Sequence, residues 1–359
     1  MSKFHTLTVA DVKQETRDAI VVTFAVPDDL QDAYRYAPGQ YLTLRTTIDA
    51  EDVRRSYSIC SGLSDKSLRV AIKRNPGGLF SNWANDTLRA GAALDVMQPM
   101  GTFTVPLDPE NRKQYLAFAA GSGITPMLSI IKTALEVEPH SCFTLFYGNR
   151  ASSSVMFKEE LAELKDKYID RFRLVYVLSR EPQDIDLFHG RINRQRCEQL
   201  FGAWVDLDTI DTAFICGPEQ MMHDVSEALQ ARGFPKSSIK AELFASSAPK
   251  RAHLARAGDV RGNQDCDVTL IVDGAHVSFT MEKDKESVLD AALRNGIDVG
   301  YSCKAGVCST CRCKVVEGKV DMDANYALED YEVARGFALS CQSFPVTDKL
   351  VVNFDQQDH

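Results

Sequence analysis

The feature that constrains this chain most is a group of four cysteines near its carboxyl end. Cys303, Cys308 and Cys311 follow the spacing C-x4-C-x2-C, and Cys341 lies farther along the chain. This spacing is typical of a [2Fe-2S] cluster, because a tight loop can supply three thiolates and a distant strand the fourth. Small residues between the cysteines let backbone N–H groups approach the sulfur atoms and stabilise their negative charge. We therefore assign these four cysteines as metal ligands.

The alternatives to a cluster are a zinc site or chance clustering. Zinc knuckles favour two paired C-x2-4-C elements, whereas only one such close pair is present here. Cys313 competes for a ligand position but falls outside the pattern, so we interpret it as a packed thiol. Four other cysteines have no evident partner and are interpreted as structural: Cys60, Cys142, Cys197 and Cys266.

Length and composition indicate a multidomain globular protein. The chain has 359 residues, which suggests two or three domains rather than one core. No apolar run approaches the roughly 18 residues of a membrane span, so no membrane partner is expected. The amino terminus lacks a basic stretch followed by an apolar core, which argues against a secretory signal. We therefore expect a cytoplasmic protein whose cysteines are reduced or bound to metal.

The acidic charge of the chain is concentrated near its carboxyl end. The formal net charge of -9 argues against a nucleic-acid partner. Residues 1–262 hold 33 acidic and 32 basic groups, whereas residues 263–359 hold 17 acidic and 9 basic groups. This acidity could serve solubility alone, or it could form a docking face for a basic protein partner.

The chain divides into successive regions that differ in their sequence patterns. Residues 1–110 contain short β-rich runs separated by turn signals, which predicts a small antiparallel β-barrel. Residues 111–246 alternate apolar strand patterns with helical spacing, which predicts an α/β domain with a parallel sheet. Residues 247–264 have no periodicity and are predicted to be a linker. Residues 265–359 combine a hairpin signal, a short helix capped by Ser287 and the cysteine loop, which predicts an α+β domain.

Two motifs in the first region indicate a flavin site. The tetrapeptide R-S-Y-S lies on a predicted strand and is followed by G-G-L-F-S. Arg55 can pair with a flavin phosphate, Tyr57 offers a flat surface, and Ser58 can bond the ring near the hydride-accepting N5. The two glycines allow the backbone N–H groups near Ser81 to hold a pyrophosphate, which favours FAD over FMN. The residues assigned to the flavin are Arg55, Ser56, Tyr57, Ser58, Gly77, Gly78, Leu79, Phe80 and Ser81.

A glycine-rich turn in the second region indicates a dinucleotide site. It follows a predicted strand and opens a helix, so its N–H groups can bind a pyrophosphate. A later strand ends in Cys216-Gly217-Pro218, where a cysteine taken alone would be read as a buried strand-end residue. Ser58 and Cys216 are our two candidate catalytic residues. The residues assigned to the nicotinamide cofactor are Gly121, Ser122, Gly123, Thr125, Pro126, Arg150, Cys216, Gly217 and Pro218.

Arg150 decides the choice between NADPH and NADH. It ends a predicted strand with no acidic residue next to it in the sequence, and Ser152 and Ser153 follow. A 2′-phosphate requires arginine and hydroxyl groups, whereas NADH sites often have an acid at this strand end. We therefore expect NADPH, although Arg150 could instead be an ordinary surface arginine.

These motifs resemble those of the ferredoxin–NADP reductase superfamily, followed over residues 266–356 by a plant-type ferredoxin domain of the β-grasp fold. In that superfamily the Cys216-Gly217-Pro218 element lies beside the nicotinamide. The resemblance therefore implies that Cys216 packs against the ring and helps to orient its C4 towards flavin N5, and that it is not a nucleophile. An aromatic residue near the end packs on the flavin in relatives, a role that the resemblance gives to Phe244. The order flavin, nicotinamide, ferredoxin occurs in reductase components of bacterial oxygenases.

Across its whole length the sequence resembles the reductase subunits of phenylacetyl-CoA epoxidases. The segments that carry this resemblance are Thr16–Ala19, Ala119–Met127, Tyr147–Arg150, Phe214–Pro218 and Asn325–Tyr326. The resemblance implies FAD, NADPH, a [2Fe-2S] cluster and delivery of electrons to a separate di-iron oxygenase component that epoxidises phenylacetyl-CoA in phenylacetate degradation.

The three cofactors together predict an electron-transfer enzyme. A nicotinamide delivers two electrons as hydride, a [2Fe-2S] cluster accepts one at a time, and a flavin can do both. Two alternatives stay open. The acceptor could be a ring-hydroxylating dioxygenase, a demethylase or a hybrid-cluster protein, or the chain could be an iron–sulfur redox sensor.

Overall fold

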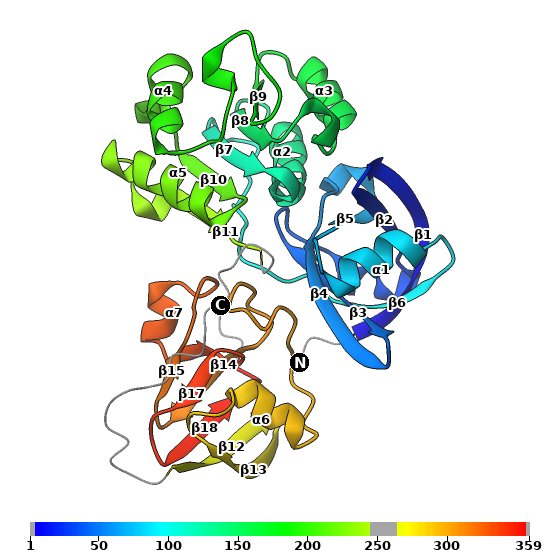
Figure 1. Ribbon diagram of the computed structural model, residues 1–359, viewed down its shortest axis with the longest axis vertical. Helices are drawn as coiled ribbons and strands as arrows, with labels where there is room; N and C mark the ends of the chain where they lie inside the picture. Colours follow the sequence, from blue (N-terminus) through cyan, green and yellow to red (C-terminus); the bar gives the residue numbers. More distant parts are fainter. Residues whose placement is uncertain (1–3, 245–263, 357–359) are drawn as a thin grey trace. The chain divides into compact units, whose positions relative to one another are not determined.

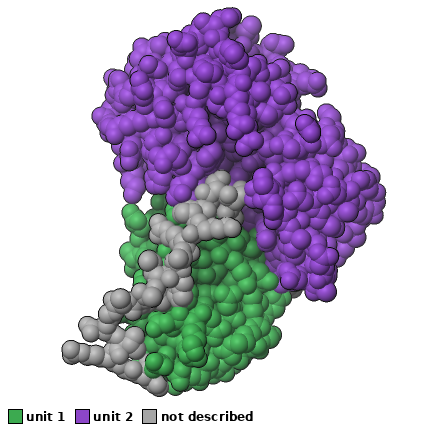
Figure 2. Space-filling model, viewed as in Figure 1, with its two compact units in different colours: residues 1–3, 248–359 green, residues 4–247 purple. Residues whose placement is uncertain are grey.

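The computed structural model describes residues 4–244 and 264–356, which divide into two compact units. One unit holds the described residues 4–244 and the other holds residues 264–356 (Figure 2). All of the predicted linker except Gln264 lies outside the described residues. No helix within the described ranges is long and apolar enough to cross a membrane.

The first part of the larger unit is an antiparallel barrel, as the short β-rich runs predict. Its strands are β1 (Phe4–Thr16), β2 (Ala19–Ala25), β3 (Tyr41–Ile48), β4 (Glu51–Ser58), β5 (Leu68–Lys73) and β6 (Ala93–Met97), in the order β4-β3-β6-β1-β2-β5. The two edge strands meet where Ile59 forms a bridge with Val70 and the Cys60 N–H donates to the Arg69 carbonyl at 2.9 Å. Closure protects both edges of the sheet. Helix α1 (Leu79–Thr87) packs beside the barrel (Figure 1).

The second part of this unit is a five-stranded parallel sheet with helices on both faces. Its strands are β7 (Gln114–Ala120), β8 (Cys142–Asn149), β9 (Phe172–Leu178), β10 (Thr212–Cys216) and β11 (Ile239–Glu242), in the order β11-β10-β7-β8-β9. Its helices are α2 (Ile124–Val137), α3 (Lys158–Lys167), α4 (Arg194–Trp204) and α5 (Glu219–Ala231). The strand order reverses between β7 and β10, and ligands of such sheets bind in the crevice at this point.

Helix α4 was not expected from the sequence. Its segment carries only three buried side chains, Cys197, Leu200 and Phe201, among polar residues, so its apolar pattern is weak. The helix is started instead by Asn193, whose side chain accepts a hydrogen bond from the Arg196 backbone N–H.

One apolar cluster spans the junction between the barrel and the parallel sheet. Cys60 and Ala71 of the barrel belong to the same buried cluster as Met127 and Ile130 of α2. Burial of these side chains across the junction is the main cohesive force between the two parts.

The smaller unit is an α+β domain with a mixed sheet, as predicted. Its main strands are β12 (Asp265–Val272), β13 (Ala275–Glu282), β14 (Arg312–Glu317), β16 (Phe337–Leu339) and β18 (Lys349–Asn353), in the order β13-β12-β18-β14-β16. Strands β15 (Val320–Met322) and β17 (Ser343–Pro345) form a small second sheet, and the helices are α6 (Val288–Arg294) and α7 (Asp330–Ala334). Ser287 caps α6 by accepting from the Asp290 N–H at 3.1 Å.

Candidate functional site

The fold brings the four predicted cluster cysteines together. Cys303, Cys308 and Cys311 lie in the loop before β14, and Cys341 follows β16. The Cys308 and Cys303 sulfur atoms are 3.0 Å apart, and Cys341 has hydrogen-bonding contacts with both Cys303 and Cys311. Within the described residues, no set of three or more His, Cys, Asp and Glu side chains is arranged around a single metal ion. The sulfur atoms form a close group in contact with one another.

The cysteine loop is shaped to favour negative charge on sulfur. The Ala305 N–H donates to Cys303 Sγ at 3.3 Å. Contacts with the Cys308 and Cys341 thiols, opposed by burial and helped by backbone N–H groups, lower the pKa of Cys303. A Cβ on Gly306 would lie 2.8 Å from the Ala324 carbonyl oxygen, so the close turn requires glycine. These donors and thiols fit a cluster held by four thiolates.

Cys313 contacts the backbone of the neighbouring strand β16. It is buried, and its Sγ lies 3.4 Å from the carbonyl oxygen of Ala338. This contact agrees with its interpretation as a packed thiol.

The R-S-Y-S motif lies at the end of β4. Arg55 is exposed, and one of its guanidinium nitrogens donates to the Arg54 carbonyl at 2.7 Å. Ser56 contacts Thr43 Oγ1 at 3.3 Å. The Tyr57 and Phe80 rings are 5.7 Å apart. The exposed guanidinium and the strand end can therefore present a cation and a hydroxyl to a flavin.

The G-G-L-F-S motif forms the start of α1. Gly77 has φ = +74°, and a Cβ on Gly78 would lie 2.6 Å from Ser81 Oγ, so both glycines serve the tight turn. The Ser81 hydroxyl accepts from the Asn75 N–H at 3.1 Å and is committed to the turn. The first N–H groups of a helix have no partner inside it, which fits a phosphate. Two assigned side chains differ in exposure: Phe80 is buried in the barrel core, whereas Leu79 is exposed.

The glycine-rich turn lies at the carboxyl end of β7 and opens α2. Gly121–Gly123 form a single 3-10 turn, and the side chains of Thr125 and Pro126 are buried in the first turn of α2. The Tyr147 hydroxyl donates to the Gly121 carbonyl at 2.9 Å and so holds the turn against β8. This turn therefore has the backbone arrangement of a pyrophosphate site.

The turn also meets the Cys216-Gly217-Pro218 segment. A Cβ on Gly123 would lie 2.1 Å from the Cys216 carbonyl oxygen. Ala119 of β7 pairs with Cys216 of β10, so both segments lie at the reversal point of the strand order. The fold thus joins two motifs that are far apart in the sequence.

The predicted residue Ser58 contacts a carboxyl group that sequence analysis did not assign. The Ser58 hydroxyl donates to Glu242 Oε2 at 3.1 Å. Glu242 ends β11 and pairs in register with Cys216. Burial of the carboxyl group disfavours its charged form and raises the pKa of Glu242 to about 7, whereas the hydrogen bond from Ser58 lowers it. The only sequence signal for Glu242 is an acidic residue between the apolar residues Ala241 and Leu243 of the predicted strand.

Cys216 is a neutral thiol in this environment. Burial, and secondarily the neighbouring Glu242 carboxyl, raise its pKa well above the ordinary value. A neutral, fully buried thiol packs rather than attacks, in keeping with the packing role expected from the sequence. Phe244, the residue assigned to flavin packing, is partly buried against the apolar core.

The surroundings of Arg150 differ from the sequence expectation. No acidic residue stands next to Arg150 in the sequence, but the fold brings one close. The Glu181 carboxylate accepts from the Ser152 N–H at 2.7 Å. The fold also brings the backbone of a second arginine next to Arg150, because the Arg180 N–H donates to the Arg150 carbonyl at 2.7 Å. Two arginines and one carboxylate therefore gather at the ends of β8 and β9.

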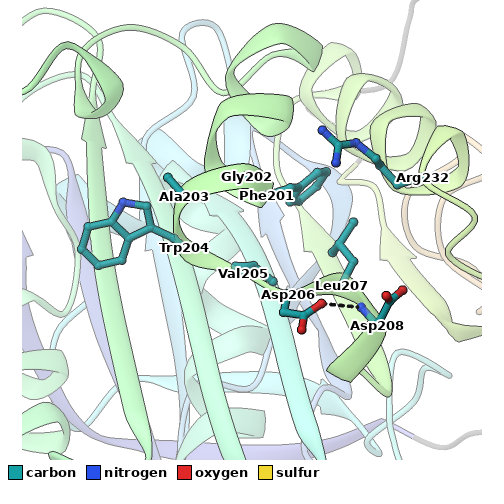
Figure 3. A pocket seen from close by; sticks show the side chains of 9 residues that line it. All are labelled: Phe201, Gly202, Ala203, Trp204, Val205, Asp206, Leu207, Asp208 and Arg232. Carbon is teal, nitrogen blue, oxygen red and sulfur yellow. Dashed lines mark hydrogen bonds between the residues drawn. The ribbon is translucent and has the colours of Figure 1, made fainter.

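A separate surface hollow of about 460 Å³ lies at the end of α4 (Figure 3). Its wall includes the exposed Trp204 and the Arg232 side chain, which is paired with Glu198. None of its lining residues belongs to the predicted motifs, so it is not part of the candidate site.

Comparison with known families matches three models to the three regions. The FAD-binding domain of oxidoreductases matches residues 6–105, and the NAD-binding domain of oxidoreductases matches residues 118–227. The 2Fe-2S iron-sulfur cluster binding domain matches residues 270–346. The chain is 48% identical over 355 residues to one of the subunits of 1,2-phenylacetyl-CoA epoxidase from Escherichia coli K12, covering 99% of both chains.

The chain belongs to the oxygenase reductase family. The 3-ketosteroid-9-alpha-monooxygenase ferredoxin reductase component of Rhodococcus rhodochrous is 37% identical to this chain, and the match covers 97% of this chain and 96% of the relative. Among solved structures, phthalate dioxygenase reductase matches with a TM-score of 0.59 at 23% identity over 98% of both chains. This likeness in fold, together with the three family matches, confirms the predicted architecture of a flavin domain, a nicotinamide domain and a ferredoxin domain. As an oxygenase reductase, the chain is an oxidoreductase that serves an oxygenase partner.

Proposed function

We propose that this oxygenase reductase passes electrons from NADPH, through FAD and a [2Fe-2S] cluster, to a di-iron oxygenase that epoxidises phenylacetyl-CoA. The observation that supports electron entry at the barrel–sheet junction is the meeting of Ser58, Cys216 and Glu242 at the strand ends. The choice of this oxygenase as the electron acceptor rests on the 48% identity with the Escherichia coli epoxidase chain.

The proposed roles of the residues follow from their positions. When bound, the cofactors supply hydride donation, conversion of an electron pair into single electrons, and single-electron transfer. Arg55 and the N–H groups at the start of α1 bind the flavin phosphates. Ser58 and Cys216 face the reacting rings, where a hydroxyl orients one ring and a neutral thiol packs against the other. The four cluster cysteines hold the iron atoms.

The proposal of NADPH is supported by the two arginines at the ends of β8 and β9. Arg150 and Arg180 lie next to each other through their backbone hydrogen bond. A pair of guanidinium groups favours the additional phosphate of NADPH. Glu181 opposes this preference, but its carboxylate is already engaged by the Ser152 N–H. FAD rather than FMN is supported by the family model that matches residues 6–105.

The di-iron nature of the partner and the cytoplasmic location are parts of the same proposal. The di-iron centre is inferred from the class of oxygenase that epoxidises a CoA thioester. A reducing compartment suits a site that needs four thiolates.

A second acceptor class is supported by the more distant relatives. Besides the ketosteroid monooxygenase components, the reductase component of glycine betaine monooxygenase from Pseudomonas aeruginosa is 29% identical over 97% of this chain. A reductase for such an oxygenase is the alternative.

The test is NADPH and oxygen consumption on mixing the protein with a phenylacetyl-CoA di-iron oxygenase, with and without phenylacetyl-CoA. We expect consumption that depends on the substrate and that forms epoxide in step with NADPH. Rapid NADPH–ferricyanide turnover without coupling to that oxygenase would mean that the reductase serves a different acceptor. Slow turnover with every acceptor would instead favour a redox sensor.

A further inference from the structure

Four charged side chains form a closed group between the barrel and the parallel sheet. Asp65 and Arg69 come from the barrel, and Lys132 of α2 and Glu160 of α3 come from the sheet part. Lys132 Nζ lies 2.6 Å from Asp65 Oδ2 and 2.5 Å from Glu160 Oε1. The Arg69 guanidinium lies 2.8 Å and 3.0 Å from the same two oxygens. Each cation therefore touches both anions, and each half of the unit contributes one residue of each sign.

This charge group is largely removed from solvent. The exposed fractions of the four side chains lie between 13% and 22%. Burial would raise the pKa of Asp65, but Lys132, together with the Gly62 N–H and Arg69, outweighs it and lowers that pKa. Burial likewise opposes the charge on Arg69, and Glu160 overcomes it, so that the pKa of Arg69 is raised. Charges that share partners in one network lose less side-chain freedom per contact than isolated surface pairs.

Backbone contacts next to the charge group fix α2 against the barrel. The Ser129 hydroxyl donates to the Ser61 carbonyl at 2.7 Å. The Leu63 N–H donates to Thr133 Oγ1 at 3.3 Å. A Cβ on Gly62 would lie 2.9 Å from the Lys132 Cβ, so only glycine allows this approach. Three consecutive backbone positions are thus held by one helix face.

The joined segments lead directly to the two cofactor motifs. The segment 61–65 begins three residues after Ser58, at the end of the strand that carries the R-S-Y-S motif. Helix α2 begins directly after Gly123 of the glycine-rich turn. Displacing α2 along the barrel would therefore shift the pyrophosphate turn relative to Ser58.

We propose that Asp65, Arg69, Lys132 and Glu160 are positioning residues that set the nicotinamide site against the flavin site for hydride transfer. This inference rests on the proposed function. The shared apolar core holds the two parts together, but apolar contact is non-directional and allows sliding. Alternating charges with defined hydrogen bonds select one register, because a shift leaves a partly buried charge without its partner.

The test compares Lys132→Met, which removes the shared cation, with Lys132→Arg, which keeps it. The matched control is Arg232→Met, which breaks the Arg232–Glu198 pair between α5 and α4 inside the sheet part. The rate of flavin reduction by NADPH is measured by stopped flow, with the primary isotope effect from C4-deuterated NADPH. Hydrogen–deuterium exchange of α2 and residues 61–65 is measured on the same full-length proteins.

We expect Lys132→Met to retain its flavin and iron but to reduce the flavin roughly 10- to 100-fold more slowly, because small misplacements of reacting atoms have effects of this size. Exchange in α2 and residues 61–65 should rise, while Lys132→Arg and Arg232→Met stay close to wild type. Unchanged reduction rate, isotope effect and exchange in Lys132→Met would overturn the proposal.

The two proposals fail in different ways. If NADPH does not reduce the wild-type flavin, the proposed function is wrong, and the exchange data still decide whether the charge group fixes α2. If the wild type is reduced and Lys132→Met matches it in rate, isotope effect and exchange, only the positioning role is wrong. Should Lys132→Met fail to fold, Glu160→Gln, which preserves the side-chain shape, carries the same test with the same two outcomes.

Discussion

The Ser58 hydroxyl donates a hydrogen bond of 3.1 Å to Glu242 Oε2, joining the end of β4 in the barrel to the end of β11 in the parallel sheet. Glu242 is also the register partner of Cys216. A hydroxyl, a carboxyl and a thiol from three strands therefore occupy the place where the flavin and nicotinamide motifs converge. The protonation state of this group depends mainly on Glu242.

We predict that Glu242→Gln removes part of the pH dependence of stability. The folded pKa of about 7 lies above the ordinary value of 4.5, so the folded chain holds the proton more tightly than the unfolded chain. The stabilising contribution is complete below pH 4.5 and is lost as the pH rises through about 7. Thermal unfolding of wild type and Glu242→Gln between about pH 5 and pH 8 measures it.

Glu242→Gln should lose less stability over this range than wild type does. Glu110→Gln, at an exposed carboxyl, serves as the control and should keep the wild-type profile. Parallel profiles for wild type and Glu242→Gln would show that Glu242 does not titrate in this interval.

We predict that Cys308→Ser abolishes the visible and electron paramagnetic resonance signals of the cluster. NADPH–ferricyanide activity should stay largely intact, because the flavin motifs lie in the other compact unit. Iron analysis and turnover assays on the purified variant measure both effects, with Cys142→Ser as the control. Loss of the NADPH–ferricyanide activity together with the cluster signals would contradict a series arrangement of the domains.

We predict that Arg150→Ala weakens NADPH binding much more than NADH binding. A lost charged hydrogen bond to the 2′-phosphate corresponds to about 1.5–3 kcal/mol, or roughly 10- to 100-fold in Kd. Arg180→Ala should act in the same direction, because Arg180 lies beside Arg150. Arg173→Ala, at an exposed position of β9, is the control. Equal effects on both dinucleotides would mean that neither arginine reads the 2′-phosphate.

The fold classes of the regions were predictable because each has a strong local period. The spacing of apolar residues over short windows distinguishes strands from helices. It therefore predicts the short strands of residues 1–110 and the strand–helix alternation of residues 111–246. The cluster cysteines were equally accessible, because three of the four are spaced within one loop. Ser287 as a helix cap is a similar case, since its hydrogen bond reaches only to Asp290.

Glu242, Arg180 and Glu181 were not predictable by the same means. Glu242 becomes part of the site only because β11 pairs with β10, which sets it beside Cys216. Arg180 and Glu181 approach Arg150 and Ser152 only because β8 and β9 are neighbours. Such contacts depend on strand order and register, which the local pattern of a sequence does not specify. The charge group around Lys132 has the same origin.

We predict that Arg55→Ala releases flavin. Arg55 is exposed at the end of the strand that carries the flavin motif, and a guanidinium binds phosphate through two parallel hydrogen bonds. Flavin content after gel filtration should fall well below one per chain, and added FAD should restore it only at high concentration. Arg35→Ala, an exposed arginine paired with Asp32, is the control. Full retention of flavin would count against the phosphate role.

We predict that Tyr147→Phe weakens binding of NADPH and NADH equally. Tyr147 is fully buried, and its hydroxyl holds the glycine-rich turn through the Gly121 carbonyl at 2.9 Å. Loss of this bond should lower the free energy of unfolding by about 1 kcal/mol and raise both Kd values several-fold, since the turn contacts the pyrophosphate common to both dinucleotides.

Tyr176→Phe is the matched control for this variant. Its ring lies 6.1 Å from that of Tyr147, and its buried hydroxyl has no hydrogen-bond partner among the described residues. Removing an unpaired buried hydroxyl should leave stability unchanged or raise it. Thermal unfolding and titration with both dinucleotides distinguish the two variants. If Tyr147→Phe affected NADPH alone, the turn would act on the 2′-phosphate end of the cofactor rather than on the pyrophosphate.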